Sequence, residues 1–184
     1  SNVKMFKYEW IWVKSKPMGF LQANFRPLKE HENVVVFSKG NATPKASNIM
    51  SYNPQGLILT NKNKIRRQGM GIGSDRASQL GEYISKGTNY PRSILKIDMD
   101  NKTTHPTQKP VALFEYLIKT YTNEGDLVLD NCAGSFTTAI ASMNLKRNWI
   151  CIEQDETYCE IGKKRIAEKK ERLLMLDNCA ELDI

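Results

Sequence analysis

The sequence has few of the residues that build metal centres and no segment that suits a membrane anchor. Its 184 residues include four cysteines and two histidines, with no Cys-x-x-Cys pair, so we predict no metal site and reduced thiols. No apolar run approaches the roughly 20 residues that a membrane helix needs, because the longest ones, such as VVVF at 34–37, have the length of a strand. The start is not a secretory signal, since Lys4 and Lys7 are followed by YEWIWV and then by further charge. We therefore expect a soluble cytoplasmic protein that binds no membrane.

Acidic residues are scarce relative to basic ones, which gives a formal net charge of +7. Residues 41–100 alone carry nine Lys and Arg against four acids. Two interpretations fit this excess: a surface for a polyanion, with nucleic acid as the first candidate, or a solvated lysine-rich face. Charge alone does not separate them. Under the nucleic-acid interpretation, the candidate DNA-binding residues are Lys62, Lys64, Arg66, Arg67 and Arg76.

Residues 1–40 contain two stretches typical of buried strands. YEWIWV at 8–13 and NVVVFS at 33–38 are rich in aromatic and β-branched residues, and both are apolar on both faces. Between them, two prolines and a glycine favour a long loop over a helix. Residues 41–104 then hold short runs such as GLILT at 56–60 without a sustained period, which predicts a loop-rich insert.

A regular period returns in residues 105–184, which we expect to form a βαβ unit of a parallel α/β sheet. Pro110 suits a first helical turn, and LVLD at 127–130 and WICIE at 149–153 predict strands on either side of the helix TTAIASMNL. Asp155 is a good cap for the last helix. The residues expected to face inward are Val111, Phe114, Leu117, Ile118 and Tyr121 in the first helix and Tyr158, Ile161, Ile166 and Leu173 in the last.

The ends of the two strands in this unit carry the residues with a chemical signature. The first strand ends in Asp130 and leads into a loop of small residues, Ala133, Gly134 and Ser135, and the second ends in Glu153. An acid at this spacing commonly accepts hydrogen bonds from ribose hydroxyls, so a nucleoside-containing cofactor is predicted. No GxxxxGK[ST] and no full GxGxxG is present, which disfavours a phosphate loop and a dinucleotide. The alternative is an ordinary strand-to-helix turn beside a surface acid.

Residues 105–166 strongly resemble the DNA amino-methyltransferases of the β arrangement, which methylate adenine N6 or cytosine N4. The family's H/N-P-T-x-K-P element, D-x-x-x-G-S-G-T-T loop and I-E-x-D strand end appear in order as HPTQKP, DNCAGSFTT and IEQD. Residues 6–40 resemble the last two strands of the catalytic sheet, and NYPRSIL at 89–95 resembles the segment before the Pro-Thr-x-Lys-Pro element. The unmatched stretch 41–88 falls where the family places its variable target-recognition region.

The resemblance implies a partial Rossmann-like methyltransferase sheet, divided into last strands (1–40), a target-recognition insert (41–104) and a cofactor-binding part (105–184). It also implies S-adenosylmethionine as cofactor. Asp155 is expected to cap a helix, with a contact at the adenine side of the cofactor as the alternative, and His31 and Glu32 are expected to be structural. The implied cofactor-binding residues are Thr107, Lys109, Pro110, Asp130, Ala133, Gly134, Ser135 and Glu153.

The implied activity is methyl transfer to an exocyclic amino group in double-stranded DNA, with adenine favoured over cytosine, as in restriction–modification. Two alternatives stay open: a degenerate, non-catalytic relative that binds DNA or a partner, and methylation of RNA or protein. The family's catalytic loop, [D/N/S]-P-P-[Y/F/W], is missing, because the chain contains no Pro-Pro pair. In the β arrangement that loop lies upstream of the equivalent of YEWIWV. We therefore expect an upstream segment, a partner chain or self-association to complete the sheet.

Phe136 departs from the family pattern, which has glycine at this position of the loop. A glycine suits a backbone that passes close to a cofactor or adopts a positive φ. The phenylalanine ring has two expected places: against the missing catalytic segment, which leaves binding intact, or inside the cofactor pocket, which weakens it. The sequence slightly favours weakened binding, because an aromatic ring adds much volume to a tight turn.

Overall fold

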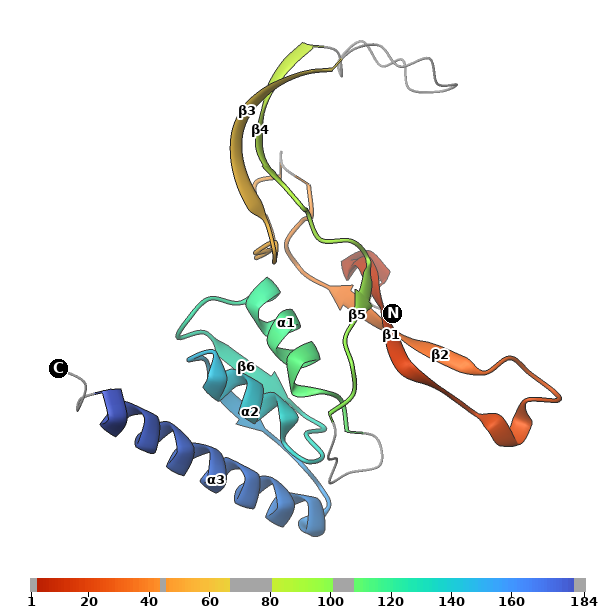
Figure 1. The fold of residues 1–184 in the computed structure, drawn as a ribbon, viewed down its shortest axis with the longest axis vertical. Coiled ribbons are helices and arrows are strands. Elements are labelled where there is room, and N and C mark those ends of the chain that lie inside the picture. Colours follow the sequence, from red (N-terminus) through yellow and green to blue (C-terminus); the bar gives the residue numbers. More distant parts are fainter. Residues whose placement is uncertain (1–2, 44–45, 67–80, 101–107, 181–184) are drawn as a thin grey trace. The chain divides into compact units, whose positions relative to one another are not determined.

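The computed structural model describes residues 3–43, 46–66, 81–100 and 108–180, which form a mixed α/β structure as predicted (Figure 1). Two compact units divide the chain: Ser1–Asn53 with Ser93–Ile184, and Pro54–Arg92. Short 3-10 turns occupy Val3–Met5 and Phe20–Gln22. The strands and α-helices are β1 (Phe6–Met18), β2 (Lys29–Phe37), β3 (Ile58–Arg66), β4 (Gly81–Thr88), β5 (Ile94–Lys96), α1 (Val111–Tyr121), β6 (Leu127–Asp130), α2 (Thr137–Asn144), β7 (Asn148–Cys151) and α3 (Glu156–Ala180).

The unit Pro54–Arg92 is built on an antiparallel hairpin of β3 and β4. Its register pairs Ile58 with Thr88 at the base. There the side-chain amide of Asn89 donates to the carbonyl of Gly56 at 2.7 Å. Polar residues fill most positions of the β3 sequence ILTNKNKIR, so neither strand is predicted from the apolar pattern of the sequence.

The strands β1, β2 and β5 form a sheet in the order β2-β1-β5, with β2 antiparallel and β5 parallel to β1. Both predicted strands at 8–13 and 33–38 are present, and no α-helix lies between them, but the connecting loop is shorter than predicted. β1 runs for 13 residues through Pro17, and β2 begins at Lys29. The proline is tolerated because the β1–β2 register shifts between Val13 and Met18, so no ladder hydrogen bond is lost at that position.

The core of this sheet lies on one face, around Trp10 and Trp12, which are 3% and 1% exposed. Each indole N–H has a partner: Trp10 donates to the Tyr121 hydroxyl at 2.6 Å and Trp12 to the Ile97 carbonyl at 2.8 Å. The expectation of burial on both faces is wrong for β2, because its side chains on the other face are exposed among the described residues. The exposed apolar side chains of β2 are Val35 and Phe37.

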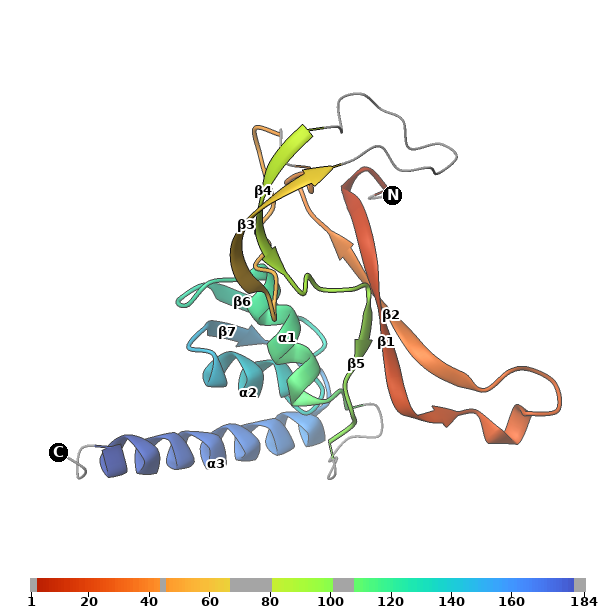
Figure 2. The ribbon, with the colours of Figure 1, turned by 45° about the horizontal axis from the view of Figure 1, so that its top comes forward.

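Helix α1 packs against two layers at once (Figures 1 and 2). On one side Leu113 joins the cluster of Trp10 and Trp12, and on the other Ile118 joins a cluster with Ala141 of α2. The expectation of a single inward face is therefore wrong: Leu113 and Thr120 were not predicted to be buried, yet both are. A helix that contacts a layer on each side has no broad solvent-facing stripe.

The predicted βαβ unit is confirmed in residues 127–180. β6 and β7 pair in parallel from Leu127 opposite Asn148, and α2 connects them. Asp155 caps α3, since its carboxylate accepts the N–H of Tyr158 at 3.1 Å. β7 ends two residues earlier than expected, because after Cys151 the chain turns into the loop that forms the candidate site.

One face of the β6–β7 pair is apolar and exposed. None of the described helices is long and apolar enough to cross a membrane. The exposed side chains, with their exposed fractions, are Leu127 (60%), Leu129 (62%), Ile150 (47%) and Ile152 (54%).

The two-sided packing of α1 predicts that both sides contribute to stability. Leu113→Ala and Ile118→Ala are each expected to lower the free energy of unfolding by about 2–5 kcal/mol, because each leaves a cavity in a different cluster. The control is Lys119→Ala on the same helix, where the side chain is exposed and a change within about 0.5 kcal/mol is expected. Urea denaturation measures all three. A Leu113→Ala protein as stable as the control would contradict packing on the sheet side.

Candidate functional site

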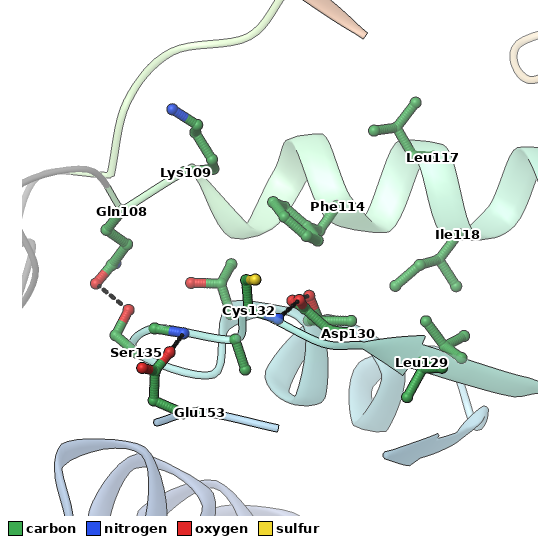
Figure 3. A pocket seen from close by; sticks show the side chains of 15 residues that line it. Gln108, Lys109, Phe114, Leu117, Ile118, Leu129, Asp130, Cys132, Ser135 and Glu153 are labelled. Atoms are coloured by element: carbon green, nitrogen blue, oxygen red, sulfur yellow. Dashed lines mark hydrogen bonds between the residues drawn. The ribbon is translucent and has the colours of Figure 1, made fainter. Parts of the chain in front are cut away.

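A cavity of about 600 Å³ opens where β6 and β7 end and runs along α1 (Figure 3). Its size falls within the roughly 300–1,000 Å³ of small-molecule sites. Open α/β sheets bind ligands at this place, beyond the carboxyl ends of parallel strands. The described residues that line it are Gln108, Lys109, Phe114, Leu117, Ile118, Val128, Leu129, Asp130, Cys132, Ala133, Gly134, Ser135, Thr137, Thr138 and Glu153.

Asp130 ends β6 and shapes the loop that follows it. One carboxylate oxygen accepts the N–H of Cys132 at 3.1 Å, and the other accepts the hydroxyl of Thr138 in the first turn of α2. The carboxylate therefore ties both ends of the loop to the strand. Each oxygen keeps acceptor capacity for a ligand, since a carboxylate has about four lone-pair sites.

Glu153 follows β7 and binds the same loop from the other strand. One of its oxygens accepts the N–H of Gly134 at 2.6 Å, while the second accepts those of Gln154 at 2.9 Å and Asp155 at 3.0 Å. These backbone hydrogen bonds lower the pKa of Glu153, that from Asp155 having the largest effect. The group is therefore ionised at neutral pH, with acceptor capacity left on the oxygen that Gly134 contacts.

Ser135 connects the loop to two other segments. Its hydroxyl donates to the side chain of Gln108 at 2.9 Å, and Arg165 of α3 donates to its carbonyl and, at 2.9 Å, to its hydroxyl. Burial lowers the pKa of Arg165, opposed by the charges of Asp100 and Glu168. A guanidinium stays protonated in proteins, so Arg165 places a half-buried positive charge under the loop.

Lys109 belongs to a charged cluster on the other side of the cavity. Its ammonium lies 2.8 Å from Glu32, which also pairs with Lys14 at 2.5 Å. Both ammonium groups stand over the ring of Trp12, at 5.9 and 5.8 Å from its centroid. Burial raises the pKa of Glu32, but the hydrogen bonds from Lys109 and Lys14 outweigh it and the pKa is lowered overall.

Phe136 lies in neither of its two expected places. Its backbone has φ 60° and ψ 34°, the left-handed conformation that a glycine loop also provides. The side chain is 8% exposed and packs in a cluster with Ala133 and Ala139, against the described part of α3. It does not line the cavity, whereas its neighbours Ser135 and Thr137 do.

Two cysteines near the site differ in environment. Cys132 is exposed and lines the cavity, and its sulfur is visible beside Asp130 in Figure 3. Cys151 is half-buried, and burial together with the charge of Asp130 raises the pKa of its thiol to about 11. Cys151 is therefore a protonated thiol at neutral pH. No group of three His, Cys, Asp or Glu within the described residues could hold a metal ion.

Most residues predicted to bind a cofactor lie around this cavity. Pro110 instead forms the buried N-cap of α1, and Thr107 lies outside the described residues. Of the predicted DNA-binding residues, three belong to β3 and two, Arg67 and Arg76, lie outside the described residues. The cavity residues among those predicted are Lys109, Asp130, Ala133, Gly134, Ser135 and Glu153, and the β3 residues are Lys62, Lys64 and Arg66.

Gln108 and Arg165 complete the site but are not predicted from the sequence. Gln108 occupies the unspecified position of the Pro-Thr-x-Lys-Pro element, so the motif carries no signal for it. Arg165 is one of many basic residues along α3. Arg165 differs from these other basic residues in lying three residues after Gly162, on the same face of the helix. This spacing identifies it as a site residue only when the packing of α3 is known.

The family model described as DNA methylase, for N6 and N4 methyltransferases, matches residues 2–164. The chain is 47% identical over 198 residues to the Type II methyltransferase M2.MboI of Moraxella bovis, covering 91% of this chain and 67% of that one. It is 42% identical over 160 residues to the Type II methyltransferase M2.DpnII of Streptococcus pneumoniae, covering 86% of this chain and 58% of that one.

Solved structures of similar fold include the crystal structure of the M1.HpyAVI–SAM complex. It has a TM-score of 0.53 and 29% identity, and the match covers 87% of this chain and 61% of that one. The cytosine-N4-specific PvuII DNA methyltransferase has a TM-score of 0.56 at 18% identity, which indicates the fold alone. The chain thus spans 58% to 67% of the length of the relatives compared by sequence above.

The bond from Gly134 to Glu153 predicts a titration that NMR can follow. Because the pKa of Glu153 lies below its ordinary value of 4.5, the bond is fully present above pH 4.5 and is lost as the pH falls through the lowered pKa. We expect the Gly134 amide shift to titrate below pH 4.5. In Glu153→Gln that amide should exchange faster at neutral pH, while the exposed control Glu171→Gln leaves it unchanged. A Gly134 amide that is insensitive to both pH and Glu153→Gln would contradict the contact.

Proposed function

The chain belongs to the DNA methylase family of N6 and N4 methyltransferases, and from this we propose that its cavity binds S-adenosylmethionine for methylation of amino groups in DNA. The observation that carries the proposal is the pair of strand-end carboxylates, Asp130 and Glu153, which hold one small-residue loop beside a cavity of about 600 Å³. When bound, the cofactor supplies an activated methyl group on a sulfonium centre. The relative crystallised with SAM supports this choice of cofactor.

The residues around the cavity fit this cofactor chemically. Glu153 has acceptor capacity left for a ribose hydroxyl, and Asp130 can accept from the amino group at the methionine end. Lys109 uses one of its three N–H donors on Glu32 and can offer another to the methionine carboxylate. Two carboxylates near the loop also favour a ligand that carries positive charge. Thr107 and Pro110 remain predicted contributors from the same element.

The proposed substrate is double-stranded DNA, with an adenine amino group favoured over that of cytosine. The unit Pro54–Arg92 carries seven Lys and Arg against two acids, an excess suited to phosphate contacts. In this proposal the hairpin of β3 and β4 supplies the target-recognition surface. Its predicted contacts are Lys62, Lys64, Arg66, Arg67 and Arg76.

Methyl transfer itself needs a further element in this proposal. In this family a [D/N/S]-P-P-[Y/F/W] loop orients the target amino group and stacks on a flipped base, and residues 1–184 contain no Pro-Pro pair. We infer that the 184 residues bind the cofactor and transfer no methyl group by themselves. The exposed apolar face of β6 and β7 would be covered by the segment that carries this loop, by a partner chain or by self-association.

A second function is favoured by the same missing loop. Without it, the chain would act as a non-catalytic module that binds DNA or a partner. The two functions differ in one property, since only the methyltransferase needs a working cofactor site. Binding of S-adenosylmethionine by the folded chain therefore discriminates between them.

Calorimetric titration with S-adenosylmethionine tests the cofactor site. We expect a dissociation constant of about 100 μM or tighter, roughly 5.5 kcal/mol. Asp130→Ala with Glu153→Ala should abolish the heat, because both acceptors are removed. The matched control, Glu160→Ala with Glu171→Ala, removes two exposed acids of α3 and should bind like the wild type. No heat from a folded wild-type chain would overturn the proposal, and unchanged affinity in the double variant would mean that the cofactor binds elsewhere.

Salt dependence tests the DNA surface. Affinity for a DNA duplex should fall steeply with salt, and alanine at Lys62, Lys64 and Arg66 should reduce the slope of log affinity against log salt by up to about 0.9 per lost phosphate contact. A control triple of exposed lysines outside the hairpin, Lys146, Lys164 and Lys170, should leave the slope unchanged. Equal slopes for the two triple variants would argue against the hairpin as the DNA surface. A preference for RNA over duplex DNA would favour a different substrate class.

A further inference from the structure

The loop that borders the cavity rests on one face of α3. Phe136 reaches that face with its ring, and Ser135 reaches it through the guanidinium of Arg165. The two α3 positions involved, Gly162 and Arg165, are three residues apart and therefore lie on the same side of the helix. The loop is thus held from below by α3 while its other side faces the cavity.

Gly162 has no side chain, and the Phe136 ring occupies the space that this leaves. It is the single buried position of α3 within residues 156–176. A Cβ atom at this position would lie 2.1 Å from Cδ2, 2.5 Å from Cγ and 2.7 Å from Cε2 of Phe136. Carbon atoms in favourable contact are about 3.5–4.0 Å apart, so the ring lies directly on the helix backbone and leaves no room for any side chain.

The ring cannot move aside without changing the cavity wall. It is enclosed by Ala133 and Ala139, and Trp149, Cys151 and Ile166 pack against that cluster. The backbone N–H of Phe136 donates to the carbonyl of Ala133 at 2.8 Å. The adjacent residues on both sides, Ser135 and Thr137, line the cavity. Any displacement of Phe136 away from α3 therefore pushes the loop toward the cofactor site.

We propose that Gly162, outside the cavity and on a different element, is a positioning residue for cofactor binding: the absence of a side chain there keeps Phe136 and its loop out of the pocket. This inference rests on the proposed function. It also accounts for a phenylalanine at a loop position where the family pattern has glycine, because the bulk added to the loop is matched by a side chain missing from the helix.

Four proteins test the proposal by calorimetric titration with S-adenosylmethionine: the wild type, Gly162→Ala, Phe136→Gly and the double variant. Gly162→Ala is expected to weaken binding at least tenfold. Phe136→Gly should bind within about threefold of the wild type, since glycine tolerates the φ of 60°. The double variant should recover the affinity lost in Gly162→Ala. Lys164→Ala, an exposed position of the same helix, is the control and should bind as the wild type does.

Thermal unfolding of the same proteins tests the contact without the cofactor. In the wild-type background, Gly162→Ala should lower the midpoint, because the new methyl group collides with the ring. In the Phe136→Gly background the same change should raise it, because alanine is the better helix former. A midpoint that rises in both backgrounds would overturn the contact. A midpoint that falls only beside Phe136, with cofactor affinity unchanged, would overturn the positioning role.

A swapped variant serves in case Gly162→Ala does not fold. Phe136→Gly with Gly162→Leu transfers the bulk from the loop to the helix and should bind S-adenosylmethionine within about tenfold of the wild type. Loss of binding in this protein, shown to be folded, would contradict the proposal. A wild-type chain that gives no heat contradicts the proposed function itself and with it the role in cofactor binding. If the wild type binds S-adenosylmethionine but Gly162→Ala shifts the unfolding midpoint in the same direction in both backgrounds, this inference alone is contradicted.

Discussion

One carboxylate holds the candidate site together. Glu153 follows β7, yet it accepts backbone N–H groups from Gly134, after β6, and from Gln154 and Asp155, at the start of α3. The three donors converge on a single ionised group, so the relative placement of two loops depends on its charge. An amide at this position would keep one acceptor oxygen but would turn an NH2 group toward the backbone N–H groups on the other side, which leaves those donors without an acceptor. The floor of the cavity is therefore fixed by electrostatics as much as by packing.

Another wall of the cavity is formed by α1, which packs against the sheet β2-β1-β5 on one side and against α2 on the other. α1 contributes Phe114 and Ile118 to the cavity and, on its opposite side, Leu113 to the cluster of Trp12. Trp12 in turn lies beneath Lys109, another cavity residue. The sheet β2-β1-β5 and the pair β6–β7 are thus connected through one helix and one indole. Both layers lie in the same compact unit.

The sequence predicts the features that local pattern determines. The cap at Asp155, the order of elements in residues 105–184 and the acids that end both strands follow from spacing alone. Contacts between distant segments do not: Arg165 binds Ser135 thirty residues away, and Lys109 pairs with Glu32, although the whole of Pro54–Arg92 lies between them in the sequence. The hairpin of β3 and β4 is also missed, because its strands are polar. The orientation of Phe136 could not be chosen from the sequence, since the room for its ring is provided by the helix.

The exposed thiol at the cavity has a practical consequence. The thiolate is the form of cysteine that attacks alkylating reagents, so Cys151, whose pKa is raised to about 11, is a poor target. Cys132, in contrast, is exposed and lines the cavity, so a reagent can reach it. A maleimide probe attached at Cys132 therefore occupies part of the pocket. Ligands and probe compete for the same space, so the rate of labelling at Cys132 becomes a chemical measure of pocket occupancy.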